Sequence, residues 1–318
     1  MSEVVDAART FFDHLASVGW TALGIALAFH LARLLTRSLA WRVILAAAYP
    51  GVPISRARIF AAYVAGVGVN SIAPARAGDV LKLVLAKRSI AGSSYATLTP
   101  TLLVETLLDV IVAGGILIWA TTQNVLPSLD VLPDLPAIDW HWPANHPKAA
   151  VVIAVVWMTV IVLLLIHWSK HVKDFWARVA AGFAILSMPR KIFLGVVPWQ
   201  ALSWFCRAAT VFFFLHAFHL PATARTTLLV LAVQSLSTLL PFTPGGVGTQ
   251  QGLIVYVFRN EPISKSTLIS FSVGMQIALT VFNVVLGLAA LLWTARTVHW
   301  KRLVTPARDE LEQQEASQ

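Results

Sequence analysis

Residues 70–79 read NSIAPARAGD and residues 240–249 read LPFTPGGVGT, and these two stretches decide the fold. In both, a proline is followed four positions later by a glycine, and the second pair follows the first at a constant distance (244 − 74 = 248 − 78 = 170). Each stretch interrupts a long apolar region and leads into a short apolar run, at 79–88 and 249–258. Paired interruptions of this kind indicate helices broken inside a membrane, where transporters commonly place their binding sites.

The composition supports a membrane protein. Of the 318 residues, 57% are hydrophobic and 12% are charged, and the mean hydropathy is +0.73. Soluble domains are about 25% charged, so a soluble globular fold is excluded. The net charge of +9 lies mostly in loops beside apolar segments, which topology and anionic lipid explain without any nucleic acid. The single cysteine, Cys206, excludes a disulfide within the chain.

The hydropathy pattern predicts an all-α polytopic protein of about seven transmembrane helices plus two half-membrane helices. A span needs about 20 apolar residues, whereas the runs at 79–88 and 249–258 would each cover roughly 15 Å, half of the hydrocarbon core. An amphipathic lead-in is expected at 1–15, a transmembrane domain at 16–295 and a polar cytoplasmic tail at 296–318. The expected spans are 16–36, 57–73, 95–121, 149–168, 196–218, 226–243 and 265–293.

Basic residues predict the orientation of these spans. Five arginines are expected between the first two spans: Arg33, Arg37, Arg42, Arg56 and Arg58. Further basic residues occur at 170–191 and 296–308, whereas 122–147 contains three aspartates and no arginine or lysine. The positive-inside rule then places the N-terminus outside and the C-terminus in the cytoplasm. The halves 16–122 and 195–295 would run in opposite senses around the connector 149–168, as an inverted-topology repeat.

The two broken stretches are candidate anion-binding sites. A helix that begins inside the membrane presents unpaired backbone N–H groups and a partial positive charge, and glycine lets a ligand approach closely. The competing interpretation is that proline and glycine only kink packed helices. The residues expected to bind a lipid head group are Pro74, Arg76, Gly78, Asp79, Lys82, Arg207, Pro244, Gly245, Gly246, Gly248, Thr249, Gln250 and Gln251.

Two intramembrane carboxylates are candidates for charge tuning or proton coupling. Glu105 and Asp109 lie four positions apart, hence on one helical face. They could neutralise Arg76 or Lys82, take up a proton or contact a cationic head group, and a structural ion pair is the alternative. The histidines and carboxylates lack metal-ligand spacing, and the phosphate-loop and hydrolase motifs are missing, so we expect no metal, no cofactor and no enzymatic activity.

The broken stretches resemble motifs of a known family. Residues 74–79 followed by Glu105 and Asp109 look like the first conserved block of the flippase-like family, which is named for the transmembrane region of lysylphosphatidylglycerol synthases. Residues 244–248 resemble its second block, P-G-G-x-G. The similarity extends over roughly residues 15–295. The family often has a glutamate after the second block, whereas this chain has Gln250 and Gln251.

The resemblance implies a multi-pass protein of the bacterial inner membrane that moves lipids between leaflets. This chain ends without the cytosolic synthase domain, so it is not expected to aminoacylate lipids itself. The expected partners are a membrane lipid as substrate and, as a candidate, a separate lipid-biosynthesis enzyme. Two alternatives remain: a membrane-embedded enzyme or accessory subunit of glycolipid or hopanoid biosynthesis, and a small-solute secondary transporter.

Overall fold

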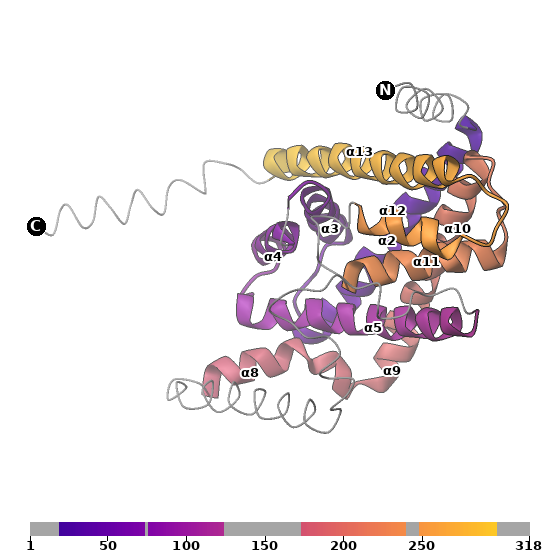
Figure 1. Cartoon of the computed structure of the whole chain (residues 1–318). Helices are drawn as coiled ribbons and strands as arrows, with labels where there is room; N and C mark the ends of the chain where they lie inside the picture. The colour runs from indigo at the N-terminus through magenta and orange to yellow at the C-terminus, as the bar shows by residue number, and fades with distance from the viewer. Residues whose placement is uncertain (1–18, 74–75, 124–172, 240–247, 298–318) are drawn as a thin grey trace, which may run out of the picture.

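The structure is a computed structural model that describes residues 19–73, 76–123, 173–239 and 248–297. All regular structure in these ranges is helical, so the predicted all-α class is confirmed (Figure 1). The predicted lead-in at 1–15, the connector helix at 149–168 and the tail beyond residue 297 lie outside the described residues.

The described chain contains two sets of four helices joined by a helical segment. The first set is α2 (Trp20–Ala48), α3 (Arg56–Asn70), α4 (Ala77–Ser89) and α5 (Tyr95–Thr122). The joining segment contains α8 (Lys173–Gly182), η2 (Ala184–Ser187), α9 (Pro189–Lys191) and η3 (Ile192–Val196). The second set is α10 (Val197–Ala217), α11 (Ala224–Leu239), α12 (Thr249–Val257) and α13 (Lys265–Thr297).

Three helices among the described residues are long and apolar enough to cross a membrane, namely α2, α5 and residues 265–295 of α13. Helices α5 and α13 leave many large apolar side chains exposed, among them Leu107 and Ile111 on α5 and Val285 and Leu292 on α13. Lipid tails cover such surfaces in a membrane protein, because a helix that crosses the bilayer must be apolar where it meets hydrocarbon.

Helix α2 is longer than the predicted span at 16–36. It continues to Ala48, so Arg33, Arg37 and Arg42 lie within the helix and their expected position in a loop is wrong. The physical reason is local, because no proline or glycine occurs between Gly24 and Pro50 to end the helix. Arg37 is partly buried and is neutralised by its ion pairs with α5, which allows a cationic residue within the bundle.

The two short helices occur where the sequence predicts them. Helix α4 has 13 residues and α12 has 9, so they extend roughly 20 and 14 Å along their axes. Helix α3 is also short, since it ends at Asn70 after 15 residues rather than at the predicted residue 73. It packs antiparallel to α4, so the two form a hairpin whose turn contains the first broken stretch (Figure 1).

Glycines bring the short helices close to their neighbours. A Cβ atom on Gly78 of α4 would overlap the carbonyl oxygen of Gly66 on α3. A Cβ atom on Gly68, two residues further along and on the other side of α3, would lie 2.8 Å from the carbonyl oxygen of Asn283 and 3.0 Å from the Cα of Gly287 on α13. Only glycine permits these contacts, so α3 packs tightly between α4 and α13.

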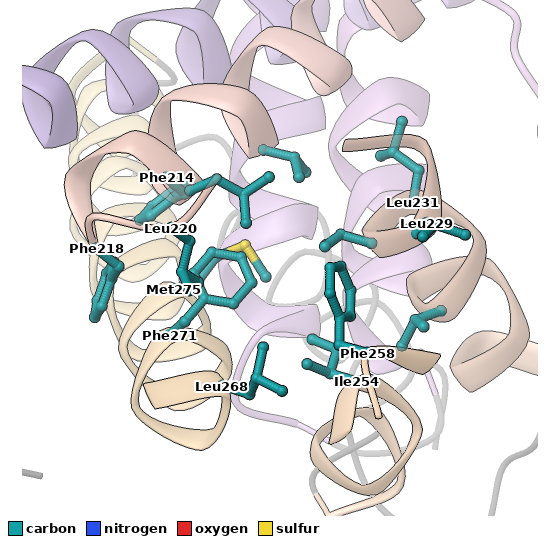
Figure 2. Packing of buried hydrophobic residues seen from close by; sticks show 14 of the residues in the cluster. Phe214, Phe218, Leu220, Leu229, Leu231, Ile254, Phe258, Leu268, Phe271 and Met275 are labelled. Atoms are coloured by element: carbon teal, nitrogen blue, oxygen red, sulfur yellow. The ribbon is translucent and has the colours of Figure 1, made fainter. Parts of the chain in front are cut away.

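The largest apolar core lies in the second set of helices. Figure 2 shows Phe214 of α10, Ile254 of α12 and Phe271 and Met275 of α13 packed toward one another. Leu229 and Leu231 of α11 complete this cluster, in which nearly every member is fully buried. The core fixes α12 between α11 and α13, and therefore positions the start of α12 at the second broken stretch.

Candidate functional site

The first broken stretch is held by Asn70 at the end of α3. Its Oδ1 accepts a hydrogen bond of 2.7 Å from the backbone N–H of Gly78, and its Nδ2 donates to Oδ1 of Asp79 at 3.0 Å. Arg76, the residue before α4, has the left-handed φ of 57°. One N–H group in the first turn of α4 is therefore already hydrogen-bonded within the protein. Gly78 lies in the close contact between α4 and α3.

Arg76 forms no ion pair with the predicted carboxylate partners. Its side chain is exposed and has no ion pair with any described residue, whereas Lys82, six residues further along the chain, is buried. The structure thus separates two cations that the sequence had assigned to one site. Pro74, the other expected contact in this stretch, lies outside the described residues.

The second broken stretch is described from Gly248 onward, and Pro244, Gly245 and Gly246 lie outside the described residues. Gly248 precedes α12 with a φ of 85°, and its N–H donates to Oε1 of Gln251 at 2.6 Å. The Nε2 of Gln251 donates to Oε1 of Gln276 on α13 at 2.8 Å. Thr249 and Gln250, which open α12, are partly buried beside this chain of amides.

The first broken stretch and the first turn of α12, which follows the second broken stretch, line one pocket. It has a volume of about 440 Å³ and lies between the end of α3, the start of α12 and the middle of α13. Its lining mixes amide and hydroxyl groups with aliphatic side chains and contains no charged residue. The lining residues are Asn70, Ser71, Ile72, Ala73, Gln251, Val273, Gln276, Ile277, Thr280 and Val281.

A hydrogen-bonded chain connects this pocket to α2. Asn283 of α13 donates from Nδ2 to the hydroxyl of Ser71 at 3.1 Å, and its Oδ1 is 2.8 Å from Nε2 of His30. His30 and Asn283 are both buried. Three helices from both halves of the chain are therefore joined directly behind the pocket by polar side chains.

A separate cluster of charges is centred on Glu105. Its Oε2 forms a 2.8 Å ion pair with Nζ of Lys82. Its Oε1 accepts from a terminal nitrogen of Arg37 and from the hydroxyl of Tyr63, each at 2.8 Å. The carboxylate therefore accepts from α2, α3 and α4 at once. Of the two expected partners, Lys82 and not Arg76 neutralises Glu105.

Asp109 belongs to the same cluster, one turn along α5. Its Oδ2 pairs with Arg37 at 2.5 Å, and its Oδ1 accepts from Nε2 of Gln200 on α10 at 2.6 Å. The side chain of Asp109 is 24% exposed, against 5% for Glu105. Asp109 is therefore the more accessible carboxylate, and it connects the first set of helices to α10.

Aromatic side chains complete the site around Lys82. Its Nζ lies 3.8 Å from the ring centroid of Tyr63 and 4.3 Å from that of Trp41. The indole N–H of Trp41 donates to the hydroxyl of Thr101 at 3.0 Å, which fixes the ring. These ring faces stabilise the buried ammonium group together with Glu105.

Arg207 lies in the middle of α10 and contacts no carboxylate among the described residues. A terminal nitrogen donates to Oε1 of Gln234 on α11 at 3.1 Å, and the guanidinium lies 4.7 Å from the ring centroid of Trp204. Arg207 does not line the pocket between the broken stretches. The expected single head-group site is thus divided into a neutral pocket and a charged cluster.

Sequence reasoning missed Arg33, Arg37, Tyr63 and Gln200 as members of the charged cluster. The arginines were treated as residues of a loop, although the uninterrupted helical stretch up to Pro50 could have placed them in the bundle. Tyr63 and Gln200 carried no signal of their own, because a single tyrosine or glutamine in an apolar helix has many structural roles.

Comparison with known families identifies the chain. Residues 7–287 match the model described as the lysylphosphatidylglycerol synthase TM region. This region of the synthases is the membrane part and not the catalytic synthase domain. No curated protein and no solved structure matches the chain.

Proposed function

The chain belongs to the lysylphosphatidylglycerol synthase TM-region family, and from this we propose that it is a lipid translocase. Its substrate would be a phospholipid, or another lipid with an anionic head group, that it moves between the leaflets of a bacterial inner membrane. A membrane location follows from the family and from the long apolar helices. A separate enzyme of lipid biosynthesis would supply the substrate.

One observation carries the proposal: the first broken stretch and the start of α12, which are far apart in the sequence, line the same pocket. The end of α3 and the start of α12 approach each other across α13, and together they enclose about 440 Å³. Pockets of this size hold small ligands or a part of a larger one. Amides and hydroxyls suit a polar head group, and the exposed apolar residues Ile277 and Val281 at its edge suit acyl chains.

The packing of the helices supports an inverted repeat. We pair α2 with α10, α3 with α11, α4 with α12 and α5 with α13. Under this pairing the main contacts among these eight helices have counterparts: α3 packs on α13 as α11 packs on α5, and α3 packs on α4 as α11 packs on α12. Helices α2 and α10 pack along each other, as two equivalent helices beside a pseudo-two-fold axis would.

Residue spacing supports the same repeat. Arg207 follows Arg37 by 170 positions (207 − 37 = 170), which is the spacing of the two prolines, and α13 begins 170 positions after α5 (265 − 95 = 170). In the proposed topology of about seven spans and two half-helices, the hairpin of α3 and α4 enters from the cytoplasmic side and that of α11 and α12 from the outside. The N-terminus is then outside and the C-terminus in the cytoplasm.

The charged cluster favours translocation over catalysis as the role of the carboxylates. Glu105 and Asp109 are each bonded to a cation and to a neutral donor, so neither is free to act as a general acid or base in this state. The hydrogen bond between Gln200 of α10 and Asp109 of α5, which joins the two sets of helices, can instead separate when one half moves against the other. Access would alternate by such a movement.

Reconstitution tests the proposal. The assay follows a fluorescent phosphatidylglycerol analogue that starts in the inner leaflet of proteoliposomes. When the protein moves the analogue to the outer leaflet, an external quencher reaches it, and we expect the fluorescence to fall faster than in protein-free liposomes. Thr280→Trp would fill the pocket and slow this exchange. The matched control is Val285→Trp, which places the same ring on the lipid-facing surface of α13, where the side chain is 62% exposed.

Equal exchange with and without the protein would refute a translocase. Loss of exchange in both tryptophan variants would refute the pocket as the route, because the control leaves the pocket unchanged. Uptake of a soluble solute by the same vesicles, with no lipid exchange, would favour a small-solute transporter instead.

A further inference from the structure

The middle of the bundle contains more cations than carboxylates. Four basic side chains contribute to this region from α2, α4 and α10: Arg33, Arg37, Lys82 and Arg207. Among the described residues Glu105 and Asp109 form ion pairs with them, and Asp79 lies one turn before Lys82 on α4. A charge that is not neutralised is costly inside a membrane, so the remaining excess of positive charge needs an explanation.

The two carboxylates are already taken by Arg37 and Lys82. Glu105 uses one oxygen for Lys82 and the other for Arg37 and Tyr63, and Asp109 uses one oxygen for Arg37 and the other for Gln200. They therefore cannot also form short ion pairs with Arg33 or Arg207 without releasing a present partner.

Arg33 and Arg207 are the two cations that form no ion pair with Glu105 or Asp109. The Nε of Arg33 is buried and has no hydrogen-bond partner among the described residues. Arg207 contacts only a neutral amide and an aromatic ring, Gln234 and Trp204. A buried donor without an acceptor costs free energy, which a bound acceptor would recover.

The two arginines lie at neighbouring levels of one helix pair. Helix α2 packs along α10, and the ring of Phe29 lies against those of Phe205 and Phe213, which places Arg33, one turn further along α2, beside the part of α10 that carries Arg207. Each arginine is near the middle of its helix, far from the ends where water or lipid phosphate would neutralise it. An anion between them would remove the repulsion between their like charges and satisfy Nε of Arg33.

We propose that Arg33 and Arg207 form a binding site for a phosphate group in the middle of the membrane. Two guanidinium groups suit phosphate because each can donate two parallel hydrogen bonds to its oxygens. If the bound phosphate belongs to a phospholipid, its phosphodiester binds between the two arginines during transport. This version of the proposal depends on the proposed translocase function. The binding of a phosphate anion does not depend on that function.

The site is distinct from the pocket between the broken stretches. No residue of that pocket belongs to α2 or α10, and the pocket lining contains no cation. The pocket would accept the polar part of a head group, and the arginine pair would neutralise its negative charge. This division explains why the pocket is lined by amides and hydroxyls and by no cation.

Lipid analysis of the purified full-length protein tests the site. We expect phospholipid to copurify with the wild type and to fall several-fold in Arg33→Gln/Arg207→Gln, which keeps polar side chains at both positions and removes both charges. The matched control is Arg190→Gln, an exposed arginine of α9. Arg33→Lys/Arg207→Lys should restore part of the bound lipid, since it keeps the charge but loses the fork.

A second measurement separates lipid from free phosphate. Inorganic phosphate should raise the melting temperature of delipidated wild type, and the double glutamine variant should bind roughly tenfold more weakly, as expected for the loss of charge-assisted bonds. Phosphate binding without copurified phospholipid would support the anion site and assign it to a free anion. Unchanged phospholipid and an unchanged response to phosphate in the double variant would overturn the site.

These outcomes are independent of the transport assay. A double glutamine variant that loses bound phospholipid while wild-type vesicles show no lipid exchange would keep the site and refute the translocase. If the double variant exchanges lipid normally and retains as much bound phospholipid as the wild type, the translocase function is supported and the arginine site is refuted. Folding of each variant is verified by its circular dichroism and its elution as a single species in detergent.

Discussion

Among single residues, Glu105 has the greatest concentration of interactions. Its carboxylate accepts from Arg37, Tyr63 and Lys82, and Tyr63 also faces the ammonium group of Lys82. Because each ion was removed from water at high cost, the loss of one partner leaves an unbalanced charge, whereas the loss of both leaves none. The structure therefore predicts strong coupling between Lys82 and Glu105.

We expect Lys82→Met to destabilise the protein by about 3–5 kcal/mol, the usual cost of breaking a buried ion pair from one side. Thermal unfolding in detergent, followed by circular dichroism, measures the effect. Lys87→Met on the exposed side of the same helix should change the melting temperature little, since its ammonium group only contacts the ring of Tyr95. Lys82→Met/Glu105→Gln should regain part of the loss, and additive effects would contradict the coupling.

Asn70 offers a second test at the residue scale. Asn70→Ala removes the acceptor for the N–H of Gly78 and the donor to Asp79, so we expect a loss of about 1–2 kcal/mol. Hydrogen exchange should quicken at the start of α4 and stay unchanged at the start of α5, where Ser94 caps the helix. Unchanged exchange in α4 would show that Asn70 does not hold this turn.

At the scale of helices, the close contact of α3 and α4 fixes the hairpin that carries Lys82 and the first broken stretch. The contact is made by backbone atoms, since Gly66 and Gly78 face each other without side chains. A helix pair of this kind tolerates no added volume, because the backbones would have to separate along their whole contact. The hairpin is therefore most sensitive at its glycines.

We expect Gly78→Ala to cost about 1–3 kcal/mol through overpacking, measured by thermal unfolding in detergent. Gly115→Ala is the matched control, since a Cβ atom at this position of α5 meets nothing within 4 Å. That control should be neutral or stabilising by up to about 1 kcal/mol, because alanine favours a helix. Equal effects of the two substitutions would contradict the proposed role of Gly78.

At the scale of the whole molecule, the proposed inverted repeat places equivalent loops on opposite sides of the membrane. Ala91 lies between α4 and α5, and Asn260 lies between α12 and α13, the equivalent position in the second set of helices. Both side chains are exposed. The sidedness of these two loops therefore tests the orientation of both halves.

Cysteine labelling measures this sidedness. In a Cys206→Ser background, which removes the only native cysteine, we expect Asn260→Cys to react with a membrane-impermeant maleimide in intact spheroplasts. Ala91→Cys should react only after the membrane is opened, because its loop is placed in the cytoplasm. Labelling of both residues from the same side would refute the inverted repeat, and the reverse pattern would invert the proposed orientation.

The sequence alone predicted the helical class and most helix positions, because hydropathy and proline–glycine pairs act locally. The short helices at 77–89 and 249–257 agree with the predicted runs to within two residues. The pairing of Glu105 with Lys82 was one of several predicted alternatives, and the structure selects it. Whether Arg76 or Lys82 pairs with Glu105 depends on the direction in which α4 runs after its first turn. No local sequence pattern predicts that direction.

The charged cluster was harder to predict because its members come from distant parts of the chain. Arg37 was misplaced because the predicted span ended at an average length, whereas α2 continues for twelve residues beyond residue 36 (48 − 36 = 12). The partnership of Asp109 with Gln200 depends on the packing of α5 and α10 and has no sequence signature. Spacing within one segment predicts neighbours along a helix, and tertiary packing decides neighbours across helices.

The shortness of α3 and α4 has a consequence for membrane voltage. In the proposed inverted repeat, both hairpins would end inside the bilayer and leave a thin insulating layer between their tips, and the transmembrane potential would fall mainly across that layer. A net charge that crosses it gains or loses about 2.3 kcal/mol for every 100 mV, whereas a zwitterion gains or loses almost nothing. The electric field of the cell would then distinguish head groups by net charge and drive them in one direction.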